Sequence, residues 1–65
     1  MTLKEWFQTQ PRGAGVKLAA AVEVTPTWIA LIAASRRKAS PRLAKAIEDA
    51  TQGAVTRQEL RPDLF

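Results

Sequence analysis

The sequence predicts a small all-α domain of four to five helices that spans residues 1–65 as a single unit. Apolar residues recur at helical spacing in several short segments. Serine or threonine precedes most of these segments as a capping residue, and proline or glycine separates them. A chain of 65 residues forms one domain with a marginal core. Because it has no cysteine for a disulfide, we expect its stability to come from helix packing and oligomerisation.

The first helix is expected over residues 2–10. Thr2 and Glu5 have the spacing of a capping box, and Pro11 ends the helix because its ring and missing N–H disfavour continuation. Residues 11–15 form a turn that contains two glycines. The apolar face of this helix, expected in the core, consists of Leu3, Trp6 and Phe7.

A second, short helix is expected over residues 16–22 and a third over residues 26–34, joined by a turn at residues 23–24. Thr25 caps the third helix, and Pro26 occupies its first position, where proline is tolerated. The residues expected to face inward are Leu18, Ala19 and Val22 in the second helix and Ile29 and Ile32 in the third. Trp28 is expected to be partly exposed.

A basic loop, defined as residues 35–39, separates the third helix from a fourth, expected over residues 41–51. Ser40 and Pro41 repeat the signal of a cap followed by proline. The apolar stripe of the fourth helix is Leu43, Ala44, Ile47 and Ala50. Gly53 fits the left-handed position that ends many helices.

The C-terminal segment contains one more helix signal. Thr56 and Glu59 have the spacing of a second capping box. A last turn of helix is therefore expected at residues 57–60, and Pro62 ends it.

The residue types exclude most catalytic and metal chemistry. The chain has no histidine and no cysteine, which removes the commonest general acid–base, the most nucleophilic side chain and the usual zinc ligands. Six acidic residues remain, and the adjacent Glu48 and Asp49 point in different directions on a helix. We therefore predict a protein that is not an enzyme and has no cofactor and no metal site.

The charge balance favours an anionic partner. Ten basic and six acidic residues give a net charge of +4, which suits nucleic acid or an acidic membrane surface, although many small domains are mildly basic. The longest apolar run, residues 28–34, is far shorter than the roughly 20 residues of a membrane span. The N-terminus lacks the pattern of a signal peptide. We expect a cytoplasmic protein that does not bind membranes.

Residues 15–32 match the spacing of a helix-turn-helix motif, in which two short helices cross after a tight turn. Counted from Gly15, the positions where the helices need apolar contact hold Leu18, Ala19, Val22, Val24, Ile29 and Ile32. A helical hairpin without a role in DNA binding has similar stripes. The preceding helix, the basic loop and the fourth helix favour a DNA-binding domain, with the motif at residues 15–34.

The sequence resembles the Cro and YdaS-type family of phage-derived repressors and antitoxins, within the lambda-repressor-like folds. The matching stretches are PRGAGVKLAAA at 11–21, VTPTWI at 24–29, SRR at 35–37, SPRLAKAIE at 40–48 and, most distinctively, GAVTRQELRPD at 53–63. The resemblance implies a helix-turn-helix domain that binds operator DNA, often as a dimer, in prophage gene control.

Two positions depart from the pattern of that family. The family usually has glycine where this chain has Glu23, so Glu23 must adopt a left-handed conformation or the turn must be remodelled. Relatives tend to carry serine and glutamine where this chain has Ala30 and Leu31. Polar side chains at those two positions would normally read base edges.

The third helix is expected to enter the major groove of DNA with its N-terminal end first. Its predicted base-reading residues are Thr25, Thr27, Ala30 and Leu31. Because this face is unusually apolar, two interpretations stay open. Its methyl groups contact thymine methyl groups, or the face binds a protein, either a second copy or another partner.

Contacts to phosphates are predicted to supply affinity for DNA. The expected contacts are Gly15, Val16, Lys17, Arg36, Arg37, Lys38 and Arg42. The start of the second helix offers free backbone N–H groups at the positive end of a helix dipole. The basic side chains would add salt-dependent affinity that is independent of sequence, although each also suits a solvated surface. Lys45, Arg57 and Arg61 are expected to face elsewhere.

These features predict a sequence-specific transcriptional regulator, a Cro-like repressor that binds double-stranded DNA as a homodimer on a pseudopalindromic operator. The candidate dimer surface is Val55 with residues 60–65. The alternative is a protein-interaction module, antitoxin-like or antirepressor-like, that keeps the fold and uses the third helix on a protein partner.

Overall fold

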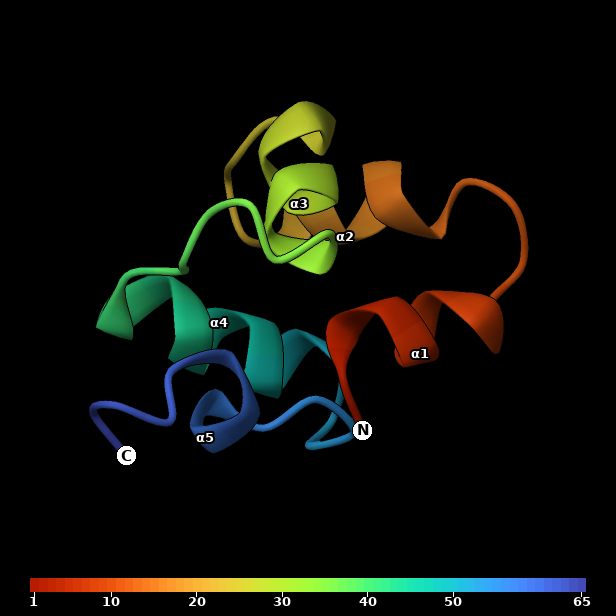
Figure 1. Ribbon diagram of the computed structural model, residues 1–65. Coiled ribbons are helices and arrows are strands. Elements are labelled where there is room, and N and C mark those ends of the chain that lie inside the picture. Colours follow the sequence, from red (N-terminus) through yellow and green to blue (C-terminus); the bar gives the residue numbers. More distant parts are fainter.

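The computed structural model describes all residues from 1 to 65 and is all-helical, as the sequence predicts. The five helices are α1 (Leu3–Gln8), α2 (Ala14–Ala21), α3 (Pro26–Ala33), α4 (Pro41–Ala50) and α5 (Arg57–Leu60). Helices α2 and α3 lie together on one side of the molecule, whereas α4, α5 and both termini lie on the other (Figure 1). No single helix is long and apolar enough to cross a membrane. Helices α2 and α3 have the required length and composition only when taken together, and the chain bends by 107° between them.

Side-chain caps start four of the helices at the places that the sequence predicts. The hydroxyls of Thr2, Thr25, Ser40 and Thr56 each accept a hydrogen bond from a backbone N–H in the first turn. Both predicted capping boxes are present. In the first, the N–H of Thr2 donates to the Glu5 carboxylate at 2.9 Å, and this bond lowers the pKa of Glu5.

The first two helices differ from the predicted ranges. Helix α1 ends at Gln8 because the chain leaves the helix at Thr9, whose hydroxyl donates to the Trp6 carbonyl at 2.7 Å. Helix α2 begins at Ala14, and its N-cap is Gly13 at φ 92°. Only one of the two glycines in this region therefore needs its conformational freedom, because Gly15 lies inside the helix.

Three helices end in the left-handed conformation at a residue other than glycine. Glu23, Ser35 and Gln52 have φ values of 62°, 62° and 56°. After each of these helices, two backbone N–H groups donate back to carbonyls in the last turn, as in a Schellman motif. Of the two alternatives expected for Glu23, a left-handed conformation or a remodelled turn, the structure has the left-handed conformation. Gly53 has a positive φ of 82°, as expected, but it is the second such residue after α4, because Gln52 occupies the first left-handed position.

The hydrophobic core is one cluster of ten buried residues: Leu3, Leu18, Ala19, Ile29, Ile32, Ala39, Leu43, Ala44, Ile47 and Val55. Ala19 is 1% exposed, as expected where α2 and α3 approach most closely. Trp6 is only half-buried and packs edge-on against Phe7, with 5.1 Å between ring centroids. Ala50, predicted in the apolar stripe, is exposed at the end of α4.

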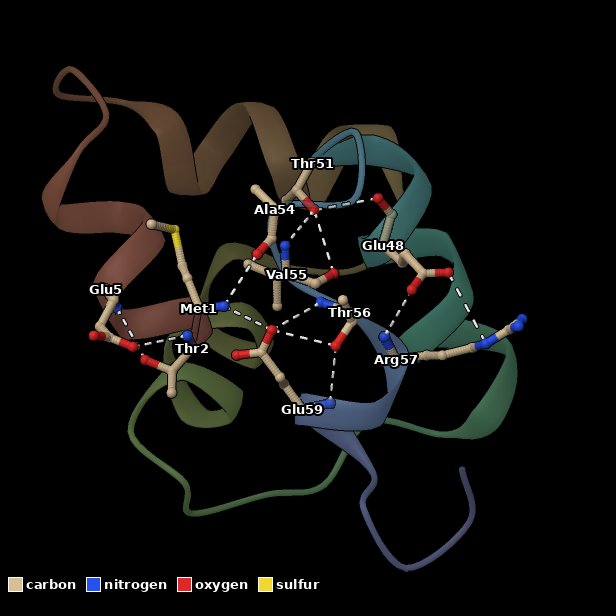
Figure 2. Close-up of polar contacts among 10 residues, drawn as sticks. All are labelled: Met1, Thr2, Glu5, Glu48, Thr51, Ala54, Val55, Thr56, Arg57 and Glu59. Carbon is tan, nitrogen blue, oxygen red and sulfur yellow. Dashed lines mark hydrogen bonds and ion pairs between the residues drawn. The ribbon is translucent and has the colours of Figure 1, made fainter.

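Val55 belongs to the core and not to a dimer surface, so that part of the prediction was wrong. Its side chain is 0% exposed. The buried hydroxyl of Thr51 donates to the Ile47 carbonyl at 2.8 Å. Its oxygen also accepts from the N–H of Val55 at 3.2 Å (Figure 2). This bond turns the chain back under α4 and places Val55 inside.

The N-terminus is joined to α5 by polar contacts. The ammonium group of Met1 pairs with the Glu59 carboxylate at 2.7 Å and donates to the Ala54 carbonyl at 3.3 Å (Figure 2). The hydrogen bond from this ammonium group lowers the pKa of Glu59. These contacts close the side of the molecule away from α2 and α3.

Candidate nucleic-acid interface

Helices α2 and α3 form the predicted helix-turn-helix arrangement. The chain bends by 107° between them, within the range typical of this motif. Buried Leu18 and Ala19 of α2 and Ile29 and Ile32 of α3 belong to the same core cluster. Because these four residues hold the inner face of the pair, the opposite face of α3 stays at the surface.

The predicted base-reading residues lie on that outer face. Thr25, Thr27 and Ala30 are exposed, and Leu31 is half-buried. The Thr25 hydroxyl oxygen accepts the N–H of Trp28 at 3.1 Å as the cap of α3, which leaves its O–H free to donate. The face therefore combines two hydroxyl groups with a patch of methyl groups.

An open groove of about 680 Å³ runs along one flank of α3, and we call it the α1–α3 groove. Its lining residues are Lys4, Phe7, Gly15, Pro26, Ile29, Ala30, Ala33, Ala34, Ser35 and Arg36. Among the predicted site residues, it brings together Gly15, Ala30 and Arg36. The lining contains two basic side chains and no carboxylate, so the groove is positively charged.

Lys4 is a candidate contact that the sequence analysis missed. It lies in α1, far along the chain from Arg36, yet both line the α1–α3 groove. No local pattern distinguishes Lys4 from any other exposed lysine on a short helix. Only the packing of α1 beside α3 places it at this face.

The start of α2 offers unpaired hydrogen-bond donors. The backbone N–H groups of Gly15 and Val16 have no acceptor within the chain, as expected in the first turn of a helix. Val16 is 61% exposed, and Lys17 beside it is exposed too. Lys17 faces a different hollow, next to Arg12 and Trp6. The positive end of the α2 dipole is therefore accessible to an anion.

The basic side chains predicted to bind phosphates line four different hollows, and that of Lys17 is separate from the other three. Arg36 lines the α1–α3 groove, whereas Arg37 and Lys38 line a hollow beside Thr2 and Glu59. Arg42 lies on the other flank of α3, in a hollow shared with Trp28 and Glu23. Trp28 is 38% exposed there, which agrees with its predicted partial exposure.

Charge pairing within the chain leaves the cations around α3 free. The side-chain ion pairs join Arg57 to Glu48 at 4.0 Å and Arg61 to Asp63 at 2.9 Å, both in the C-terminal part. The basic side chains without an ion pair are Lys4, Arg12, Lys17, Arg36, Arg37, Lys38, Arg42 and Lys45. Of these, Lys4 and Arg36 line the α1–α3 groove on one flank of α3, and Arg42 lies on the other flank, so unneutralised positive charge is present on both sides of the exposed helix.

Arg61 has a defined partner set that the sequence analysis did not predict. Its guanidinium donates to the Ala39 carbonyl at 2.8 Å and to both Asp63 carboxylate oxygens at 3.0 and 2.9 Å. The same pairing lowers the pKa of Asp63 to about 2 and raises the pKa of Arg61. Arg61 thus faces the basic loop and not the solvent alone.

Comparison with known proteins gives two matches. The model of a family described as "Bacterial toxin YdaS" matches residues 9–65. A protein of Escherichia coli (strain K12) named "Prophage transcriptional regulatory protein" is 35% identical over 63 residues, which covers 97% of this chain and 96% of that protein.

Proposed function

Because the chain belongs to the family described as bacterial toxin YdaS, we propose that it is a prophage-type transcriptional regulator that binds double-stranded DNA. The observation that carries this proposal is the set of unpaired cations on both flanks of the exposed helix of a helix-turn-helix pair. The name of the Escherichia coli relative supports the same class of function. The protein acts by binding and is not an enzyme.

Helix α3 enters the major groove with its N-terminal end first, and its outer face contacts the bases. Thr25 and Thr27 supply hydroxyl groups for base edges. Ala30 and Leu31 supply methyl groups that suit the methyl group of thymine. This arrangement favours sites with thymine at the positions opposite the middle of α3.

The two flanks of α3 hold the two DNA backbones. On the flank of the α1–α3 groove, the free N–H groups of Gly15 and Val16 and the side chains of Lys4 and Arg36 bind phosphates of one strand. Arg42 lies on the other flank and binds the second strand. The remaining predicted phosphate contacts, farther from α3, are Lys17, Arg37 and Lys38.

The regulator binds as a two-fold dimer, with half-sites about one helical turn apart. The dimer surface is the C-terminal segment at residues 60–65, without Val55. Leu64 is 49% exposed and Phe65 is 46% exposed, so this end presents apolar area for a second copy. The dimer represses by occupying its operator in the manner of Cro.

The test is selection from a pool of randomised duplex DNA at two salt concentrations. Recovery of a two-fold-symmetric motif is the expected result. An unenriched pool, with binding that disappears as salt is added, would overturn sequence-specific reading and leave only phosphate contacts. The contribution of the α1–α3 groove is tested by the variant Arg36→Gln. Its matched control is Lys45→Gln, because both variants remove one exposed, unpaired cation but only Arg36 lines the groove.

A second candidate function is protein binding by the outer face of α3. The apolar character of the α1–α3 groove and the description of the family as a toxin favour it. Leu31→Gln separates the two functions, because Leu31 is only half-buried and the fold should survive. A DNA reader changes its base preference in this variant. A protein binder keeps its DNA affinity and loses its partner or its self-association.

A further inference from the structure

The most distinctive stretch of the sequence ends in Leu60-Arg61-Pro62-Asp63, and none of the DNA contacts proposed above uses it. Arg61 is the least exposed of the paired basic residues, with 18% of its side chain accessible. Its Nη1 donates to the Ala39 carbonyl across 22 residues of sequence. Its Nε and Nη2 donate to the two carboxylate oxygens of Asp63. All three bonds are 2.8–3.0 Å long.

Ala39 is the last residue of the basic loop. It is 0% exposed and directly precedes Ser40, the cap of α4. The last backbone bond that fixes the loop on the α3 side is from the N–H of Arg37 to Leu31. The backbone of Lys38 and Ala39 makes no other hydrogen bond. The bond from Arg61 is therefore the polar contact that holds the C-terminal end of the basic loop.

The C-terminal stretch is built to present the guanidinium in one orientation. The carboxylate of Asp63 binds it through two parallel bonds, a geometry that only arginine supports. Pro62 restricts the backbone between the two residues. With its other donors engaged in this way, Nη1 is directed at the Ala39 carbonyl.

We infer that Arg61 is a positioning residue for DNA binding, holding the basic loop so that its three cations, Arg36, Arg37 and Lys38, keep their places before DNA arrives. A loop that is already ordered loses less conformational entropy when it binds. This inference rests on the proposed function, since the cations of the loop matter only if the partner is an anion. Asp63 acts one step further away, by orienting Arg61.

Asp63→Asn gives a test in which two explanations predict opposite signs. The substitution removes a negative charge close to Lys38, so Coulomb attraction alone would tighten DNA binding. If Arg61 positions the loop, the loss of the bidentate pair weakens binding by about threefold to tenfold at low salt, measured at a protein concentration where the variant and the wild type have the same dimer fraction. Base preference stays unchanged, because the reading residues are untouched. Tighter binding by Asp63→Asn would overturn the inference.

Arg61→Lys has the matched control Arg57→Lys. Both substitutions keep the charge, and both residues follow α4 in the chain. Arg57 pairs with Glu48 at 4.0 Å and lies over the Phe65 ring, but it makes no hydrogen bond to the loop. We expect weaker DNA binding for Arg61→Lys and unchanged binding for Arg57→Lys. Equal effects in the two variants would contradict a positioning role.

Backbone ¹⁵N relaxation of the free protein tests the same inference without DNA. In Arg61→Lys and Asp63→Asn, the amides of residues 36–39 should become more mobile while the amides of α2 and α3 keep wild-type values. Unchanged loop mobility in both folded variants would overturn the inference. If the wild type binds no DNA but the loop loosens as described, the proposed function fails while the contact retains its structural effect on the loop.

Discussion

Glu23, Ser35 and Gln52 hold left-handed backbone conformations that L-amino acids adopt only at a cost. Each closes a helix and lets the next segment turn sharply, so the strain is distributed over three connections of a small domain. The two central connections of the site, α2 to α3 and α3 to the basic loop, depend on Glu23 and Ser35. At the scale of the residue, stability is therefore given up where the motif must bend.

Replacing Glu23 with glycine should stabilise the protein. Glycine relieves the left-handed strain but gains freedom in the unfolded chain, so we expect a net increase of about 0.5–1 kcal/mol in the free energy of unfolding. Urea denaturation followed by circular dichroism measures it. Glu23→Ala is the control, because it removes the charge without relieving the strain. An equal gain in Glu23→Ala would show that strain at this position is not the cause.

Asp63 should make the stability of the protein depend on pH in the acid range. Its pKa is lowered from 3.8 to about 2 in the folded state, first by its hydrogen bonds to Arg61. A lowered carboxylate pKa stabilises the fold above the unfolded value and loses that effect as the pH falls through the folded value. Wild-type stability should thus fall between pH 4 and 2, with a contribution that Asp63→Asn lacks.

The measurement is thermal unfolding of both proteins across this pH range. The pKa values of Glu5 and Glu59 are lowered as well, so the variant should retain part of the acid dependence. Superimposable profiles of melting temperature against pH for the wild type and Asp63→Asn would contradict the contribution of the Arg61 pair.

At the scale of the element, two glycines near the start of α2 have different backbone conformations. Gly13 sits at φ 92° outside the helix, whereas Gly15 lies within it. A Cβ on Gly15 would meet the Phe7 ring at 3.9 Å, an ordinary contact. Free N–H groups at this end remain available whichever side chain follows. The helix start can therefore be strengthened without covering its donors.

Gly15→Ala and Gly13→Ala should shift stability in opposite directions. Alanine at 15 favours the helix by about 0.5–1 kcal/mol, whereas alanine at 13 must adopt a left-handed conformation and destabilises by about 1 kcal/mol. Chemical denaturation of the two variants measures both effects. If Gly15→Ala destabilised the protein as Gly13→Ala does, residue 15 would belong to the turn, as the sequence alone suggested.

At the scale of the whole molecule, the two sides have different roles. The side of α4 and α5 holds both termini (Figure 1) and the contacts of Arg57 and Thr51 (Figure 2). The ion pair of Arg61 lies in the same C-terminal part of the chain. The side of α2 and α3 carries unpaired cations such as Lys17 and Arg36. Self-association through the C-terminal end would leave the charged side free to bind DNA.

Phe65→Ser should weaken self-association. Phe65 is 46% exposed, with the Arg57 guanidinium 5.3 Å from its ring centre, so it presents an aromatic anchor of the kind that dominates interfaces. Sedimentation equilibrium without DNA should show a dimer in the wild type and a shift toward monomer in the variant. Val16→Ser, at an exposed apolar residue on the opposite side, is the control. A monomeric wild type would remove this surface from the proposal.

Local sequence determined most of the helices and the motif. Caps such as Thr25 and Ser40 act on the backbone three residues away, and apolar spacing assigns a face to each helix, so both signals lie within a few residues of chain. The start of α2 and the ends of α1 and α4 lie one or two residues from their predicted positions. Which residue first takes the left-handed conformation after a helix, such as Gln52 before Gly53, depends on how the following turn packs. The sequence also determined the positive charge and the outward residues of α3.

Only the tertiary structure decided which distant residues meet. It buried Val55, brought Lys4 beside Arg36, divided the basic loop between two hollows and joined Arg61 to Ala39. The physical reason is that these outcomes arise from contacts between segments separated by tens of residues. Local spacing carries no information about which exposed arginine faces solvent and which finds a buried carbonyl.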